Sequence, residues 1–335
     1  MNSQDNNRKH YIFLLMPEFT LLAFSSAVEV LRMANSALGY DAYDWITVAT
    51  EGNEARSSCG VRIHCDESLA KMRRATLSFG RDYTVVVCGG FNINKHTNKT
   101  IESWLREWKK SRSIIGSLCT GAYVLARAQL LGERRFVIHW ENAASFGEQF
   151  HDAAIRPALF EIDDGIITCA GGMAAFDMMA HLVQLEHGEA VAREICERAI
   201  VDRIRNPGER QRSPFKVQSS KQHKIITILI ERMQESLSDP IPISEILSGT
   251  DLTRRQVERI FQQELCISPA KYYMRLRLER SRLMLHQTNT PIVDIAIANG
   301  FSSASHFSKS YRDFYAHTPH EARKNPKLHG RKYLS

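Results

Sequence analysis

The sequence predicts two domains of different fold class, a parallel α/β domain followed by an all-α domain with two helix-turn-helix motifs. Through residues 11–204, strand-like apolar runs alternate with helical segments. From 252–319, one pattern of apolar residues and prolines occurs twice, with a constant offset of 50 residues. Residues 206–335 hold 21 Lys and Arg against 12 Asp and Glu, whereas residues 1–205 hold 23 against 25. A chain of 335 residues has room for two such domains.

Composition narrows the class of protein. No apolar run approaches the roughly 18–20 residues that a membrane span needs, and the first ten residues lack the apolar region of a signal peptide. Seven cysteines, without a CxxC pair, argue against a disulfide framework and against structural zinc. We therefore expect a cytoplasmic protein without a membrane partner, a metal or a cofactor.

The first domain begins with a buried strand. Residues 11–16 form a continuous apolar run that Pro17 ends, typical of a strand buried on both faces. Leu21, Phe24 and Leu31 lie on one stripe of the helix that follows. Further strands are predicted at 45–49, 83–88, 113–118 and 136–139, and helices at 101–110 and 121–130.

The end of this domain has a different pattern. Residues 160–169 predict a hairpin that turns at Asp163-Asp164-Gly165. Two helices between 171 and 204 then close the domain, which we expect to span residues 1–205. The polar stretch after Asn206-Pro207-Gly208 predicts a linker over 206–222 and a second domain over 223–335 that opens with a helix at 224–237.

The repeat in the second domain predicts its architecture. In the first copy, Val257, Phe261 and Leu265 lie four apart on one helical face, and Pro269 marks a new helix start. Their counterparts in the second copy are Phe307, Tyr311, Tyr315 and Pro319. Short helices that begin at Pro242 and Pro291 precede the copies, and Asn299-Gly300 ends the second of these helices. Each copy is therefore predicted to be a helix-turn-helix.

The two motifs are joined by a predicted helix over 269–287. Its length of roughly 28 Å is close to the roughly 34 Å turn of B-DNA. Such a helix could hold the two helix-turn-helix motifs in successive segments of the major groove. The excess of Lys and Arg in residues 206–335 favours binding to phosphate backbones. Helix-turn-helix geometry suits B-form DNA better than RNA.

The motifs TRRQVERIF (253–261), Ser268-Pro269 and GFSSASHF (300–307) resemble the AraC/XylS family of bacterial regulators over about 110 residues. Two positions depart from the family: Leu247 replaces its usual alanine and Cys266 its usual glycine, which suggests local repacking. The resemblance implies a DNA-binding transcriptional regulator, an activator and a homodimer, with double-stranded DNA and RNA polymerase as partners.

The resemblance also assigns DNA-binding residues. Base-facing positions fall on Arg255, Glu258 and Arg259 in the first recognition helix. In the second they fall on Ala304, Ser305 and Lys309, and the expected DNA-binding set also includes Arg254, Ser303 and His306. Arg can pair with guanine and Glu with cytosine, although a phosphate contact is the alternative for each Arg or Lys. A partly packed helix residue is the alternative for His306.

Cys119 stands where a predicted strand feeds directly into a helix. This arrangement resembles a nucleophile elbow, in which a helix N-terminus lowers the thiol pKa. With His139 and Glu141 a Cys/His/Glu group is conceivable. The alternative is that Cys119 lines a pocket.

The segments Cys119-Thr120-Gly121, His139-Trp140 and Cys169-Ala170-Gly171-Gly172 resemble the class I glutamine amidotransferase-like (ThiJ/PfpI) superfamily, nearest to isocyanide hydratases. The resemblance covers roughly residues 10–200 and implies a flavodoxin-like parallel sheet sandwiched by helices. Enzymes of the superfamily place a carboxylate on the first helix beside the cysteine, where this chain has Ala23. The PfpI-type histidine after the cysteine is replaced by Thr120. We therefore expect no catalytic residue and a ligand-sensing domain that also supplies the dimer surface. The alternative is a cysteine-dependent hydrolase or hydratase tethered to DNA, with Glu18 as a substitute acid.

The ligand class also comes from resemblance. The sequences of residues 119–122 and 138–142 are similar to those of regulators of glycine betaine, carnitine, sarcosine or arginine catabolism. A quaternary amine or amino acid could lie on Trp140 with Glu141 as counter-charge, and Cys119, Thr120 and His139 complete the expected ligand-binding set. A core role is the alternative for Trp140.

Overall fold

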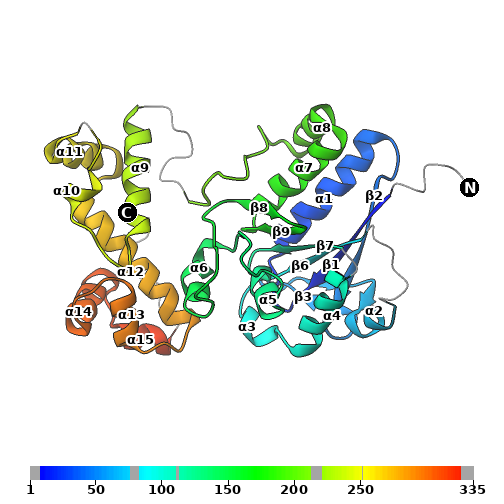
Figure 1. The fold of residues 1–335 in the computed structure, drawn as a ribbon, viewed down its shortest axis with the longest axis horizontal. Coiled ribbons are helices and arrows are strands. Elements are labelled where there is room, and N and C mark those ends of the chain that lie inside the picture. Colours follow the sequence, from blue (N-terminus) through cyan, green and yellow to red (C-terminus); the bar gives the residue numbers. More distant parts are fainter. Residues whose placement is uncertain (1–7, 76–82, 111–112, 213–220, 251, 326–335) are drawn as a thin grey trace, which may run out of the picture. The chain divides into compact units, whose positions relative to one another are not determined.

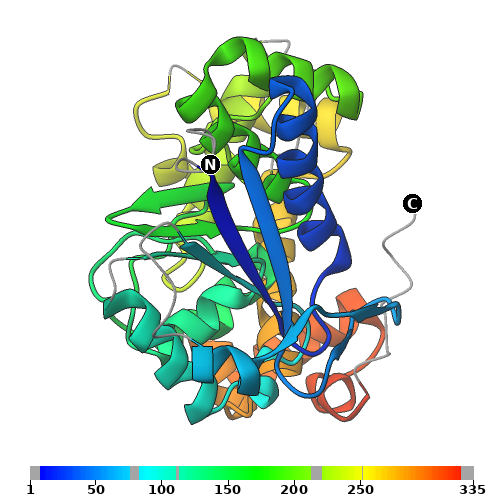
Figure 2. The same cartoon turned by 90° about the vertical axis from the view of Figure 1, so that its right-hand side faces the viewer.

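The computed structural model describes residues 8–75, 83–110, 113–212, 221–250 and 252–325. The chain divides into two compact units, Met1–Gln211 and Arg212–Ser335. Figures 1 and 2 show the sheet of the first unit and the helices of the second.

A seven-stranded sheet forms the centre of the first unit, in the order β5-β2-β1-β6-β7-β9-β8. All neighbouring strands are parallel except β8 and β9. This confirms the predicted flavodoxin-like class. The strands are β1 (Lys9–Leu15), β2 (Tyr43–Ala49), β5 (Glu67–Ser68), β6 (Tyr83–Cys88), β7 (Ile114–Leu118), β8 (Phe160–Asp163) and β9 (Ile166–Cys169).

Helices cover both faces of the sheet (Figures 1 and 2). One face packs against α1 (Leu21–Leu38), α7 (Ala174–His187) and α8 (Glu189–Ala199). The other face packs against α2 (Leu69–Ala75), α3 (Ile93–His96), α4 (Lys99–Lys110), α5 (Gly121–Arg127) and α6 (Trp140–Gly147). Alternate residues of β1 enter the two cores, Phe13 the first and Ile12 the second. A strand buried on both faces needs a continuous apolar run, which is why residues 11–16 were recognisable.

Helix α1 has enough length and apolar character to cross a membrane, with a mean hydropathy of 1.2 over its 18 residues. In the structure it packs against α7, α8 and β2. Its buried residues, among them Phe24, Val30 and Leu31, belong to the core of the unit. A core helix of an α/β domain passes the same composition test, so the finding is weak evidence for a membrane span.

One predicted strand is wrong. Phe136 makes an isolated bridge to Ile155, and 136–139 joins no sheet. The Phe136 N–H donates to the Ala154 carbonyl at 3.2 Å, and its carbonyl accepts from the Arg156 N–H at 2.8 Å. The place beside β7 is taken by β9. The predicted hairpin is confirmed by β8 and β9, whereas the small hairpin of β3 (Glu54–Arg56) and β4 (Arg62–His64) was not predicted.

The second unit repeats its helices with the predicted offset. Helix α9 (Lys221–Glu235) comes first. Helix α12 (Pro269–Gln287) packs against helices of both motifs. The first motif comprises α10 (Ile243–Ile246) and α11 (Arg254–Leu265), and the second α13 (Ile292–Ala298) and α14 (Ala304–Tyr315); α12 (Pro269–Gln287) and α15 (Pro319–Lys324) follow them. These helices confirm the all-α class and both helix-turn-helix motifs.

Cap residues repeat with the same offset. Thr253 and Ser303 cap the recognition helices, and their hydroxyls accept from a backbone N–H three residues later. Both recognition helices end in left-handed residues, Cys266 with φ 54° and Ala316 with φ 64°. A left-handed position suits glycine, which explains why the resembled family usually has glycine at the position of Cys266.

The segment predicted as a linker begins inside the first unit. The Leu159 N–H donates to the Pro207 carbonyl at 3.1 Å, and the Gln211 N–H donates to the Pro157 carbonyl at 3.3 Å. Residues 206–211 therefore belong to the first unit. Most of the remaining predicted linker, 213–220, lies outside the described residues.

Gly300→Ala will destabilise the second unit more than Gly249→Ala. Both glycines are left-handed, with φ 71° and 72°, which costs alanine about 1–2 kcal/mol. A Cβ at Gly300 would lie 2.2 Å from the Pro240 ring, whereas one at Gly249 meets nothing within 4 Å. Overpacking should therefore add roughly 1–3 kcal/mol at Gly300. Urea unfolding of the full chain measures both, and equal losses would contradict the contact.

Candidate functional site

Cys119 occupies the turn between β7 and α5, in the left-handed conformation with φ 58°. Its N–H donates to the Cys169 carbonyl at 3.0 Å. Three glycines let the chain approach this turn. A Cβ would lie 2.2 Å from the Val87 carbonyl at Gly121 and 2.7 Å from the Cys119 Cβ at Gly171. At Gly89 it would lie 2.3 Å from the Gly121 nitrogen.

The Cys119 thiol is buried, with 8% of the residue exposed. Burial raises its pKa above the ordinary thiol value and outweighs the hydrogen bonds from Thr20 and Thr120, which lower it. The Thr20 hydroxyl donates to Sγ over 3.4 Å. A protonated thiol is a poor nucleophile, so the turn has the shape of a nucleophile elbow without an activated sulfur.

Within the described residues, neither Ala23 nor Glu18 supplies the acid that the resembled enzymes place on the first helix. Ala23 is buried in α1 and carries no titratable group. The Glu18 carboxylate accepts from Asn92 Nδ2 at 2.7 Å and lies 3.3 Å from His96 Nε2. The Asn92 hydrogen bond is the largest cause that lowers the pKa of Glu18. Glu18 is therefore held by α3 and the residue before it, and not by the thiol.

His139, Trp140 and Glu141 form the start of α6. His139 is the N-cap, and its Nδ1 accepts from the Glu141 N–H at 3.4 Å. Burial lowers the pKa of His139, and the Glu141 charge partly opposes this. That charge is also the smallest of the causes that shift the pKa of Cys119, and it raises that pKa.

The other predicted ligand residues differ in accessibility. The Thr120 hydroxyl is buried and donates to the Gly90 carbonyl at 2.7 Å, so it is already engaged. Trp140 is half-buried, and its ring centroid lies 5.7 Å from that of His139. The structure therefore leaves part of Trp140 accessible, whereas the Thr120 hydroxyl is already bonded within the protein.

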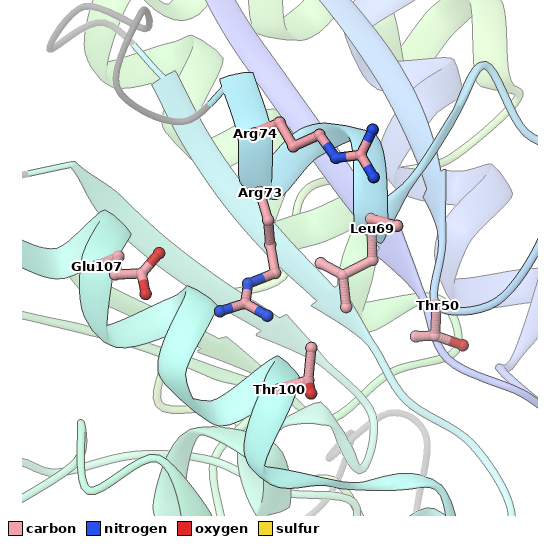
Figure 3. A pocket seen from close by; sticks show the side chains of 7 residues that line it. Thr50, Leu69, Arg73, Arg74, Thr100 and Glu107 are labelled. Carbon is pink, nitrogen blue, oxygen red and sulfur yellow. The ribbon is translucent and has the colours of Figure 1, made fainter.

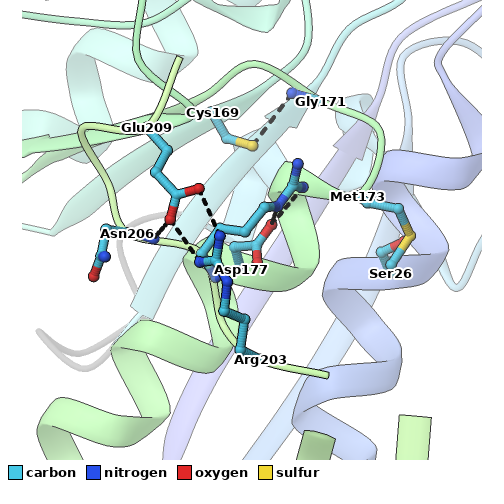
Figure 4. Close-up of polar contacts among 9 residues, drawn as sticks. Ser26, Cys169, Gly171, Met173, Asp177, Arg203, Asn206 and Glu209 are labelled. Atoms are coloured by element: carbon cyan, nitrogen blue, oxygen red, sulfur yellow. Dashed lines mark hydrogen bonds and ion pairs between the residues drawn. The ribbon is translucent and has the colours of Figure 1, made fainter. Parts of the chain in front are cut away.

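A polar cluster follows the Cys169–Gly171 turn (Figure 4). The buried Asp177 of α7 accepts from the Arg205 N–H at 2.8 Å and from its Nε and Nη2 at 2.9 and 2.6 Å. Glu209 accepts from both Arg203 amines, at 2.6 and 2.9 Å. These pairs fix residues 203–209 on the first unit. Sequence reasoning missed them because Asp177 and Arg205 are 28 residues apart.

Two cavities lie elsewhere in the first unit. One of about 410 Å³ lies between α2 and α4, with Arg73 pointing toward the helix that carries Thr100 and Glu107 (Figure 3). Its charged side chains are exposed and solvated, which weakens their interactions. The other, of about 360 Å³, is floored by Phe136, Phe146 and Phe150. Neither is lined by Cys119.

Helix α11 presents the predicted reading residues to solvent. Val257, Ile260 and Phe261 are buried, whereas Arg255 and Arg259 are exposed. Arg254 Nε donates to Glu258 Oε1 at 3.1 Å, in an exposed pair that contributes little and can be exchanged for contacts with DNA. Within the described part of the chain, Arg255 and Arg259 form no ion pair. Both guanidinium groups are available to a polyanion.

Helix α14 presents a less basic surface. Ser305, His306 and Lys309 are exposed and Ala304 is half-buried. The Ser303 hydroxyl accepts from the His306 N–H at 3.1 Å, so it caps the helix. The His306 ring centroid lies 5.7 Å from that of Phe301, edge to face. His306 is therefore both packed on one side and exposed on the other.

Comparison with known proteins follows the two units. A model described as a helix-turn-helix domain matches residues 248–325, and a model of the DJ-1/PfpI family matches residues 9–185. The HTH-type transcriptional regulator GbdR of Pseudomonas aeruginosa is 36% identical over 325 residues, 97% of this chain and 87% of that protein. The regulator CdhR of the same species is 33% identical over 311 residues, 93% and 90% of the two chains. A crystal structure of an AraC family transcriptional regulator from Pseudomonas putida is 26% identical, with a TM-score of 0.50, and covers 57% of this chain and 99% of that one.

Cys119 will react with iodoacetamide more slowly than Cys59 at pH 7. Burial raises the pKa of Cys119, whereas a hydrogen bond from Ser57 lowers that of the exposed Cys59. Each pKa unit changes the thiolate fraction about tenfold. Mass spectrometry of the native protein gives both rates between pH 7 and 10. A Cys119 rate that levels off below pH 8 would show an activated thiolate instead.

Arg259→Ala will weaken binding to specific DNA by about 1–3 kcal/mol and binding to unrelated DNA much less. The reason is that its exposed guanidinium is available for base contacts. Titration of the full chain with a DNA selected from a random pool, and with unrelated DNA, measures the two affinities. Arg312→Ala, which removes an exposed charge from α14, is the control and should weaken both equally. Equal losses for Arg259→Ala would identify a phosphate contact.

Proposed function

Because this chain belongs to the helix-turn-helix transcriptional regulators whose N-terminal domain is of the DJ-1/PfpI family, we propose that it activates transcription in response to a small cationic amine or amino acid. Binding of DNA by its second unit follows from family membership. The ligand and the sign of regulation are the proposed part. The observation that supports the proposal is the α6 start, where the partly accessible Trp140 is followed by the Glu141 carboxylate, whose charge reaches the buried Cys119 thiol and raises its pKa.

The chemistry of this turn suits a cation. An aromatic face attracts an ammonium group, by about 0.5–2 kcal/mol depending on how far the site excludes water. The Glu141 carboxylate adds a counter-charge, and burial lowers the pKa of His139, whose Nδ1 lies 3.8 Å from that carboxylate, which disfavours a competing imidazolium. An uncharged Cys119 thiol would offer a polarizable, weakly polar surface to the ligand. Glycine betaine, carnitine, sarcosine and arginine all carry such a cation.

A cysteine-dependent hydrolase or hydratase is the alternative. It would need a thiolate and an acid that returns a proton to the leaving group. Burial opposes the thiolate at Cys119, Ala23 occupies the usual acid position, and Glu18 is bonded to Asn92. These features support a binding site rather than a catalytic site.

The proposed mechanism requires further partners. We infer that the protein acts as a homodimer whose first unit supplies the dimer surface, that the activator contacts RNA polymerase, and that it functions in the bacterial cytoplasm at its DNA sites. Reading residues on both α11 and α14 support recognition of two neighbouring DNA segments by each subunit. Arg254, Arg255, Glu258 and Arg259 are proposed on α11, and Ser303, Ala304, Ser305, His306 and Lys309 at α14. Ligand binding would shift the population between two DNA-binding states.

Glu141→Gln will lower the affinity for glycine betaine, carnitine, sarcosine or arginine about tenfold or more, because a hydrogen bond or ion pair to a charged group contributes roughly 1.5–3 kcal/mol. Thermal melting of the full chain measures binding, since a ligand at 100 times its Kd stabilises by about 2.7 kcal/mol. Glu148→Gln, at the other end of α6, is the matched control and should leave the affinity unchanged.

Three results would contradict the proposal. If no member of the panel shifts the melt, the ligand class is wrong. If Trp140→Ala leaves the affinity of a folded protein unchanged, the aromatic contact is wrong. If product forms in the same wells and Cys119→Ser abolishes it, the protein is an enzyme tethered to DNA.

A further inference from the structure

Gln211, the last residue of the first unit, holds the start of α6. Its side-chain Oε1 accepts from the Trp140 N–H at 2.7 Å, and its Nε2 donates to the carbonyls of Ile138 and Ala158, both at 2.9 Å. One amide side chain therefore uses both its donor and its acceptor groups on the segment that contains the proposed ligand turn. It comes from 71 residues further along the chain.

The hydrogen bond to Trp140 completes the cap of α6. The first N–H groups of a helix have no partner within the helix. His139 satisfies the Glu141 N–H with its own ring nitrogen, which leaves the Trp140 N–H to an outside acceptor. Gln211 supplies that acceptor. Any shift of Trp140 or Glu141 that moves the first turn of α6 must stretch the bonds to Gln211 or move Gln211 with it.

The segment before Gln211 is fixed to a different helix. Arg205 is bound through its backbone and its guanidinium to the buried Asp177 of α7, and Glu209 binds Arg203 (Figure 4). Loss of Arg205 would leave the buried Asp177 carboxylate without its charged partner, which makes this pair costly to break. The α7 attachment is therefore firm. The Gln211 attachment consists of neutral hydrogen bonds, which are individually weaker than charge-assisted ones.

The chain leaves the first unit at this weaker attachment. Arg212, the next residue, belongs to the second unit. Within that unit its guanidinium donates to Glu279 of α12 at 3.2 Å, and Arg275 donates to the same carboxylate at 2.8 Å.

We propose that Gln211 is the positioning residue that transmits occupancy of the α6 site to the chain leading into the DNA-binding unit. This inference rests on the proposed function for the location of the ligand and adds the route by which its binding is passed on. A ligand held by Trp140 and Glu141 shifts the first turn of α6, the Gln211 side chain follows it, and the Asp177–Arg205 pair holds the preceding residues still. The movement is thereby confined to the residues around 211.

The test uses hydrogen exchange and DNA affinity of the full chain in three backgrounds: wild type, Gln211→Met and Glu209→Gln. Methionine keeps the length of glutamine and removes its hydrogen-bonding groups. Glu209→Gln is the matched control, because it weakens a neighbouring pair that does not touch α6. The site is perturbed in two ways, with glycine betaine as the probe and with Trp140→Ala, which needs no ligand.

In the wild type and in Glu209→Gln, either perturbation should change exchange in 206–212 and should change the affinity for a selected DNA about fivefold or more, the lower end of usual allosteric coupling. In Gln211→Met, exchange at 140–142 should still respond, but exchange at 206–212 and DNA affinity should not. An undiminished response of DNA affinity in Gln211→Met overturns the inference.

The two proposals fail differently. If glycine betaine leaves residues 140–142 of the wild type unchanged while Trp140→Ala alters DNA affinity through Gln211, the ligand is wrong and the route holds. If glycine betaine binds and alters DNA affinity equally in all three backgrounds, the ligand class holds and the route is wrong. If Glu209→Gln loses the response as completely as Gln211→Met, the whole segment and not Gln211 carries the signal, which also overturns the inference.

Discussion

The close approach of backbone at Cys119 is the constraint on which the first unit depends. The ends of β6 and β7 and the turn after β9 meet there, and at Gly89, Gly121 and Gly171 any Cβ would collide with backbone or with Cys119 itself. The contact fixes the start of α5 against the sheet. It also holds Cys119 in a left-handed conformation that costs a non-glycine residue about 1–2 kcal/mol. Core packing on both sheet faces offsets this cost.

The second unit depends on a different feature, a set of helix N-caps that occurs in both copies of the repeat. Thr253 and Ser303 begin the recognition helices, and Ser268 and Thr318 begin the helices that follow. Each cap contributes about 1 kcal/mol and fixes where its helix starts. Because apolar residues follow the caps at the same spacing in both copies, the exposed face of each recognition helix is fixed too. Arg259 and Lys309 consequently occupy equivalent outward positions, 50 residues apart.

Local and periodic signals account for what the sequence could predict. Continuous apolar runs located β1 and β6, and the 50-residue repeat located both motifs, with the bounds of α12 predicted as 269–287. The run 136–139 has the composition of a strand, but the backbone groups of Phe136 bond to Ala154 and Arg156, and the Ile138 carbonyl accepts from Gln211. No local pattern could reveal this. The Asp177–Arg205 pair and the Gln211 contacts are equally invisible, because their partners are 28 to 73 residues apart. The caps could have been found, since Thr253 with Gln256 matches the capping-box spacing.

The same local geometry can support catalysis or binding, and the surrounding groups decide between them. At Cys119 the chain keeps the left-handed turn and the adjacent helix start of a nucleophile elbow. The close backbone approach at three glycines fixes both. The parts that activate a thiol are altered, since burial raises its pKa and alanine stands at the usual acid position. Glu141 contributes a negative charge that further disfavours the thiolate. Under the proposed function, the same Glu141 carboxylate that opposes the thiolate would hold the cation of the ligand. The first turn of α6 then becomes the element that a ligand would move, and the Trp140 N–H is the atom through which that movement would reach Gln211.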